Sequence, residues 1–242
     1  MFKNRHILRS VSELVTLGAK QTLVDFRNGW IEQEAPFTDR LVANLQNQID
    51  GKTIKGIRWK AKTLTDRGTR SQESLYGADF LGILSLDLHD LRVTKGFLAQ
   101  AKLFRSRKPI ANSEFERLRD QCRKMLSVTP DSFVFLYTNR RIKIIPACSV
   151  IGISPSALRN LSDRTIGKFF AEYVECFIGD PKLDAPSLES FRALAEQYQI
   201  RQGLYLYASA GGDLPEKEPV LLSQFERPIV QQRHVRVRRI LT

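Results

Sequence analysis

Apolar residues along the chain alternate between helical spacing and strand-like runs. Near the start, residues 11–15 carry a short helical stripe. A second stripe covers residues 41–49 and follows the polar pair Thr38-Asp39, which predicts a helix that begins after this pair and ends at Gly51. Residues 53–59 then have the alternation that is typical of a strand. The first quarter of the chain therefore predicts two helices and a strand.

The centre of the chain predicts an antiparallel hairpin. Residues 78–88 form a long apolar run, His89-Asp90 marks a turn, and residues 92–104 provide the returning strand. The polar stretch 62–72 before it is expected to be a loop. Three strands thus follow the first helices.

Helices and strands continue to alternate after the hairpin. Ser113 and Glu116 form a capping-box signature ahead of an apolar helical stripe, which predicts a helix start. Residues 132–138 are continuously apolar, as in a strand buried on both faces, and residues 142–146 are the expected neighbouring strand. Two further helices and a strong last strand are expected over residues 166–177, 191–198 and 203–209. This order of elements predicts an α/β fold.

The composition predicts one globular domain with a basic surface. The 242 residues are 42% hydrophobic, which is enough to bury a core, and 38 Lys+Arg against 26 Asp+Glu leave a net charge of +12. A basic surface attracts polyanions such as nucleic acids. Many basic proteins have no such partner, so net charge alone does not indicate nucleic-acid binding unless a candidate site accompanies it.

The chain carries no pattern of an exported or membrane protein. Its three cysteines lie far apart and form no CxxC pair, which argues against a disulfide framework and a zinc site. No apolar run approaches the roughly 18 residues of a membrane span. We expect a cytoplasmic protein without a membrane partner.

The predicted hairpin carries the candidate chemistry. Asp79 heads its first strand, and Gln100-Ala101-Lys102 lies near the end of its second. Gln100 and Lys102 are two residues apart and share one face of the strand. Carboxylate, amide and carbonyl oxygens from Asp79, Gln100 and Ala101 suit Mg²⁺ or Mn²⁺, while the Lys102 ammonium could orient water or stabilise a phosphate. These residues predict hydrolysis of phosphodiesters.

Glu73 to Phe80 (Glu-Ser-Leu-Tyr-Gly-Ala-Asp-Phe) followed by Gln100-Ala101-Lys102 resembles the PD-(D/E)xK phosphodiesterase superfamily in the QxK variant of Mrr-type enzymes. The resemblance covers about residues 30 to 140. It implies a restriction-endonuclease-like core over residues 30–146, with a mixed central sheet flanked by helices in the order αβββαβ. C-terminal helical and strand additions over residues 147–242 would complete a single domain, 1–242.

The same resemblance implies a metal-dependent deoxyribonuclease, with RNA as the other substrate to test, in prokaryotic or phage defence or DNA processing. In that family a glutamate on the first core helix often joins the metal ligands. Glu34 is the matching candidate and Glu73 the competing one, and the sequence leaves the choice open.

Two positions depart from the pattern of the family. Gly77-Ala78 stands where the name-giving motif has proline, and Gln100 replaces an acid, which removes one negative charge from the metal site. The departure at Gln100 supports the alternative that the chain is an inactive nuclease-fold module that binds nucleic acid or serves a structural role.

Basic residues flank the candidate site in the sequence and could hold a phosphate backbone, although ordinary surface charge is an equal interpretation. They are Lys60, Lys62, Arg67, Arg70, Arg105, Arg107 and Lys108. Arg236 and Arg238 alternate with valines near the end of the sequence, as in a strand with one basic face or in a basic tail. Cutting both strands of a duplex calls for two sites, which would favour a homodimer.

Overall fold

The computed structural model describes residues 4–65, 76–104 and 110–210, and their elements belong to one compact unit within Met1–Gly211. The helices are α1 (Arg5–Arg27), α2 (Glu34–Ile49), α3 (Asn112–Val128), α4 (Cys148–Ile151), the 3₁₀ helix η1 (Pro155–Asn160), α5 (Ile166–Val174) and α6 (Leu188–Gln197). The strands are β1 (Thr53–Ile54), β2 (Ile57–Thr65), β3 (Phe80–Leu88), β4 (Leu91–Phe104), β5 (Ser132–Thr138), β6 (Ile142–Pro146), β7 (Arg164–Thr165) and β8 (Gln202–Ala210).

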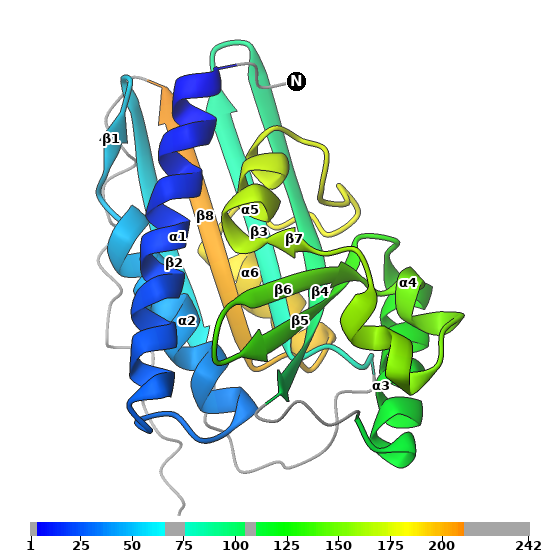
Figure 1. Ribbon diagram of the computed structural model, residues 1–242. Coiled ribbons are helices and arrows are strands. Elements are labelled where there is room, and N and C mark those ends of the chain that lie inside the picture. Colours follow the sequence, from blue (N-terminus) through cyan, green and yellow to red (C-terminus); the bar gives the residue numbers. More distant parts are fainter. Residues whose placement is uncertain (1–3, 66–75, 105–109, 211–242) are drawn as a thin grey trace, which may run out of the picture. The chain divides into compact units, whose positions relative to one another are not determined.

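The described strands form an eight-stranded mixed open sheet in the order β1-β2-β8-β3-β4-β5-β6-β7 (Figure 1). The α/β fold that the sequence predicts is therefore confirmed. Strands β3 and β4 pair antiparallel from Phe80↔Ala99 to Leu88↔Leu91 around the turn at His89-Asp90, so the predicted hairpin is also confirmed. Strand β5 has the predicted bounds and pairs with β6.

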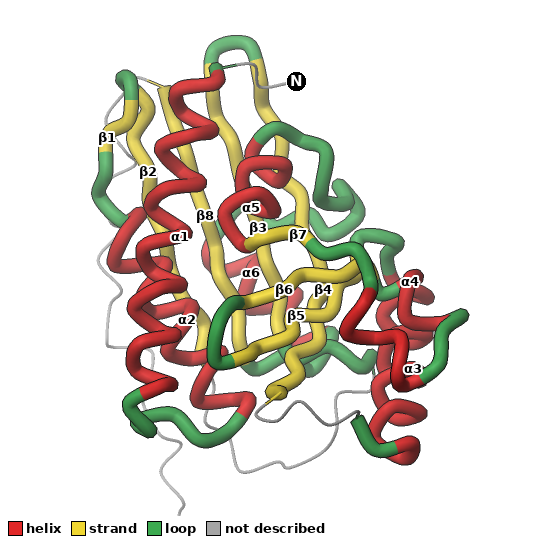
Figure 2. Tube along the Cα trace, viewed as in Figure 1, coloured by secondary structure: helices red, strands yellow, loops and turns green. Residues whose placement is uncertain are grey.

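Helices cover both faces of the sheet and create two cores. Helices α1, α2 and α5 pack on one face, and α3, α4 and α6 pack on the other (Figure 2). On β4, Ala99 and Ala101 join the core under α1 and α2, whereas Leu98 joins the core under α3 and α6. Because side chains of a strand alternate between the two faces, Gln100 and Lys102 point to the α3 side.

The position of β8 could not be expected from the order of the strands along the chain. It pairs antiparallel with β2 and parallel with β3, and so separates two strands that follow each other in the sequence. A strand from residues 202–210 therefore lies in the middle of the sheet.

The predicted start of α2 was wrong by one helical turn. The helix begins at Glu34, and Thr38-Asp39 lies inside it instead of capping it. The Thr38 hydroxyl bonds to the Glu34 carbonyl at 3.1 Å and to the Tyr137 hydroxyl at 2.9 Å, so tertiary and helical partners satisfy it. This earlier start places Glu34 on the first turn of the helix.

Other predicted boundaries also need correction. Helix α3 begins at Asn112 after Ala111, without a side-chain cap, so Ser113 and Glu116 form no capping box. Strand β2 continues to Thr65, because β8 pairs with it along its whole length; residues 62–65 are therefore not a loop, and residues 66–72 lie outside the described residues. Helix α5 ends at Val174, which leaves Phe177 outside it and 63% exposed.

Helix α1 spans far more than the predicted stripe at residues 11–15, since its buried positions recur along most of its length. Within the described ranges, no helix combines the length and the apolar character needed to cross a bilayer.

Candidate active site

The candidate site forms where β4 runs on beyond the start of β3. Phe80, the first residue of β3, lies opposite Ala99, so residues 100–104 extend past it. Backbone N–H groups at such an edge need acceptors. The Asp79 carboxylate accepts from the Ala101 N–H and the Glu34 carboxylate from the Leu103 N–H, each at 3.2 Å. Two acids thus take the places that β3 carbonyls would otherwise occupy.

Asp79 meets the end of β4 as the hairpin register predicts. Its own N–H donates to the Ala99 carbonyl at 2.9 Å, and Asp79 Oδ2 accepts a hydrogen bond from Gln100 Nε2. Burial raises the pKa of Asp79 to about 6, while the Ala101 N–H and the nearby charge of Lys102 act in the opposite direction. The carboxyl group therefore ionises within the range of ordinary assay buffers.

The amide of Gln100 is only half satisfied. Its nitrogen donates to Asp79 Oδ2 and, at 3.2 Å, to the Ala101 carbonyl, whereas its buried oxygen Oε1 has no hydrogen-bond partner in the described part of the chain. An unpaired buried polar oxygen is costly, so it indicates a missing donor or cation. A half-turn of the amide group would exchange the positions of its nitrogen and oxygen. Oε1 would then lie beside Asp79 Oδ2 and the Ala101 carbonyl oxygen, which the nitrogen now contacts.

Glu34 reaches the site from α2 and holds Lys102. Lys102 Nζ lies 3.3 Å from Glu34 Oε2, with the two side chains 10% and 32% exposed. The start of α2 is fixed by Gln202 of β8, whose amide donates to the Ala35 carbonyl at 2.8 Å and to Asp39 Oδ1 at 2.7 Å. The predicted proximity of Glu34 to the strand residues is thus present in the structure, but its carboxylate is already engaged by Lys102 and the Leu103 N–H.

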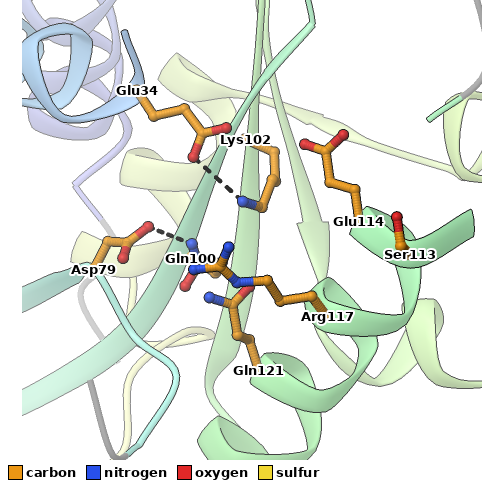
Figure 3. A pocket seen from close by; sticks show the side chains of 8 residues that line it. All are labelled: Glu34, Asp79, Gln100, Lys102, Ser113, Glu114, Arg117 and Gln121. Atoms are coloured by element: carbon orange, nitrogen blue, oxygen red, sulfur yellow. Dashed lines mark hydrogen bonds and ion pairs between the residues drawn. The ribbon is translucent and has the colours of Figure 1, made fainter. Parts of the chain in front are cut away.

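A cavity of about 560 Å³ opens over these residues (Figure 3). Its strand wall consists of Glu34, Asp79, Gln100 and Lys102. Its helix wall consists of Ser113, Glu114, Arg117 and Gln121 of α3. This second wall was not predicted from the sequence, although the spacing of four residues between Ser113, Arg117 and Gln121 is the signal of one helix face. Every lining side chain is polar, which suits a charged ligand.

The loop that carries Asp79 packs directly against α3. Gly77 has a φ of +72°, and a Cβ atom there would lie 2.5 Å from the Gln121 carbonyl oxygen. Only glycine combines this backbone conformation with so close an approach. Glycine at position 77 therefore has a local reason, because this residue places Asp79 against the helix wall.

The donor atoms fit a hard cation better than a soft one. In the ranges 4–65, 76–104 and 110–210, no three His, Cys, Asp or Glu side chains form a group that could hold a metal ion. Asp79, Gln100 and the Ala101 carbonyl offer instead a mixed set of oxygens, which Mg²⁺ and Mn²⁺ accept. Gln121 Oε1 is a second buried amide oxygen without a partner among the described residues. These unpaired oxygens indicate that the site fits such a cation.

The predicted basic residues lie away from this cavity or outside the described residues. Lys60 and Lys62 are on β2, which β8 and β3 separate from β4, and Lys62 Nζ lies 4.0 Å from Asp50 Oδ2. The described ranges do not include Glu73 and the other predicted basic residues, namely Arg67, Arg70, Arg105, Arg107, Lys108, Arg236 and Arg238.

Comparison with known proteins gives no assignment. No protein-family model, no curated protein and no solved structure matches the chain.

Proposed function

We propose that this protein is a metal-dependent nuclease that hydrolyses phosphodiester bonds of DNA. The observation that carries the proposal is the meeting of Asp79, Gln100 and Lys102 on one wall of a polar cavity, with the Gln100 oxygen buried and unpaired. Apart from the two-residue strand β1, the order α2, β2, β3, β4, α3, β5 agrees with the αβββαβ order of a restriction-endonuclease-like core, with β8 as an addition between β2 and β3. This agreement in element order is additional support, and the main argument for the proposal is the arrangement of the site residues.

Each residue of the strand wall has a distinct role in the proposal. Asp79, Gln100 Oε1 and the Ala101 carbonyl would hold Mg²⁺ or Mn²⁺, which supplies a bound water of lowered pKa and offsets charge on the phosphorus oxygens. Lys102 shares the strand face of Gln100 and donates to the attacking water or to the scissile phosphate. Glu34 acts through Lys102, since it holds the ammonium group at 3.3 Å. Glu73 stays a predicted further ligand.

Cleavage of nucleic acids by the full chain tests the proposal. Linear DNA, supercoiled DNA and RNA are incubated with Mg²⁺ or Mn²⁺ and the wild type, Asp79→Ala, Lys102→Ala or the control Asp87→Ala. Asp87 lies on β3 and pairs with Arg92 away from the cavity. We expect DNA cleavage that needs the metal, survives Asp87→Ala and is lost in both site variants. Equal residual cleavage in all four proteins would indicate contamination and contradict the proposal.

A second candidate is a nuclease-fold module that binds nucleic acid without cutting it. It is favoured by the neutral Gln100 and by the lack of a three-acid cluster among the described residues. A gel-shift measurement in the same buffers separates the two candidates. Metal-independent binding without any cleavage would favour the module.

A further inference from the structure

The helix wall of the cavity carries a cation that the strand motif does not include. Arg117 lies four residues after Ser113 and four before Gln121, on the face of α3 that lines the cavity. Figure 3 shows its side chain reaching from α3 toward the Gln100 side of the cavity. Burial has the largest influence on the pKa of Asp79 and raises it, whereas the positive charge of Arg117 is one of the smaller influences that lower it. The Arg117 guanidinium therefore lies close enough to Asp79 for its positive charge to favour the ionised carboxylate.

The strand wall alone offers little positive charge to a reacting phosphate. Lys102, its cation, has Glu34 as a counter-ion at 3.3 Å. Gln100 is neutral, and the oxygens of Asp79, Gln100 and Ala101 suit one divalent cation better than two, because they include a single carboxylate. Negative charge grows on the non-bridging oxygens during phosphodiester hydrolysis, and a second cation on the opposite wall would offset it.

An arginine suits this position for geometric reasons. Its planar guanidinium can donate two parallel N–H bonds to a phosphate, which an ammonium group cannot do. Arg117 is exposed to solvent at the helix wall, so a substrate can reach it without displacing buried side chains. Arg117 from α3 and Lys102 from β4 line the same cavity, so a phosphate bound there would have a cation on each wall.

We infer that Arg117 is a further catalytic residue, which binds the non-bridging oxygens of the scissile phosphate from the helix wall. The inference rests on the proposed phosphodiester hydrolysis. The guanidinium transfers no proton and forms no covalent bond; it stabilises charge that is larger in the transition state than in the bound substrate.

Steady-state cleavage of DNA by the full chain with Mn²⁺ or Mg²⁺ tests the inference. Arg117→Ala should lower kcat by about 10²–10³-fold and change KM by less than about threefold. Arg117→Lys should retain part of the rate. Added guanidinium ion should restore part of the rate of Arg117→Ala but not that of Lys102→Ala, which a purely structural role would not produce.

Arg123→Ala is the matched control, because it removes the same charge from an exposed position of α3 that does not line the cavity. It should cleave at the wild-type rate. An unchanged kcat in Arg117→Ala, a loss confined to KM, or an equal loss in Arg123→Ala would overturn the inference while the nuclease proposal stands. A wild type that cleaves no nucleic acid with either metal would overturn both.

Discussion

Asp79 and Gln100 face each other across the open end of the β3–β4 hairpin, and the Gln100 amide nitrogen donates to Asp79 Oδ2. The pair combines two unfavourable features: a half-buried carboxyl group with a raised pKa and a buried amide oxygen without a partner in the described residues. A cation bound to Asp79 would favour its ionised form, and a half-turn of the Gln100 amide would bring Oε1 to the same side. Variants of this pair and of its neighbours can therefore separate ligand, positioning and structural roles.

Asp79→Asn should stabilise the metal-free fold and abolish cleavage. The shift of the Asp79 pKa from 3.8 to about 6 means that the ionised carboxylate destabilises the fold. At about 1.4 kcal/mol for each pKa unit, the gain at pH 7.5 is at most about 3 kcal/mol. Urea unfolding in EDTA measures it, with Asp87→Asn as the control at a partly exposed carboxylate away from the cavity. A less stable Asp79→Asn variant would contradict the burial argument.

Metal binding and folding stability should depend on pH in opposite directions. Because the folded-state pKa of Asp79 is raised, the native chain binds more protons than the unfolded chain between pH 3.8 and about 6, so this group makes stability fall as pH rises through that window. Metal binding needs the ionised carboxylate, so Mn²⁺ affinity should rise about tenfold from pH 5 to pH 7. Calorimetric titration measures the affinity, and a flat profile would argue against Asp79 as a ligand.

Gln100→Glu should increase the metal affinity and weaken the metal-free fold. A second carboxylate beside Asp79 places two like charges within hydrogen-bond reach, which a cation relieves. We expect a lower Tm in EDTA and a larger rise of Tm on adding Mg²⁺ than for the wild type. Gln121→Glu is the control on the opposite wall of the cavity, where the effect should be smaller. Equal effects at both positions would show that only the net charge of the cavity matters.

Glu34→Gln should lower the cleavage rate without lowering metal affinity. The Glu34 carboxylate contacts Lys102 Nζ and the Leu103 N–H, so its loss disturbs the position of the ammonium group. We expect kcat to fall by about 10–100-fold and the Mn²⁺ dissociation constant to change by less than about threefold. Glu32→Gln, at an exposed neighbouring position, should behave as the wild type. A tenfold or larger loss of Mn²⁺ affinity would instead identify Glu34 as a ligand.

Gly77→Ala should destabilise the fold and displace Asp79. The change combines an unfavourable positive φ with a clash of 2.5 Å against the Gln121 carbonyl oxygen. We expect a loss of about 2–4 kcal/mol together with weaker Mn²⁺ binding. Gly29→Ala separates the two causes, since Gly29 has a φ of +79° but a Cβ there would meet no atom within 4 Å, and it should lose only about 1 kcal/mol. Equal losses would show that the contact with α3 is unimportant.

The hairpin and its face pattern could be predicted because they depend on neighbours in the sequence. The turn at His89-Asp90 fixes the register, and the register brings Asp79 to Gln100. The side of Lys102 follows from the two-residue period of a strand. The resemblance to a nuclease motif added Glu34, and the structure shows why it lies at the site: α2 begins one turn earlier than its polar residues indicated.

The helix wall and the sheet order could not be predicted because they depend on contacts between distant segments. Arg117 and Gln121 are ordinary polar positions of an amphipathic helix until β4 packs beside α3. The central place of β8 arises from pairing with two strands more than a hundred residues earlier in the chain. Spacing along the sequence can place side chains on one face of a helix, but it does not show which strand packs beside that face or which strands pair.

The place of β8 has a consequence for biosynthesis. Residues 202–210 bridge β2 and β3, so a nascent chain that already contains Asp79 and Lys102 still lacks the strand that joins the two parts of its sheet. Pairing between such remote segments is slow compared with local structure formation. Until residues 202–210 have been made, the nascent chain can therefore form the β3–β4 hairpin but not the complete sheet. Fragments that end earlier would lack the Gln202 hydrogen bonds that fix the start of α2 and with it the position of Glu34.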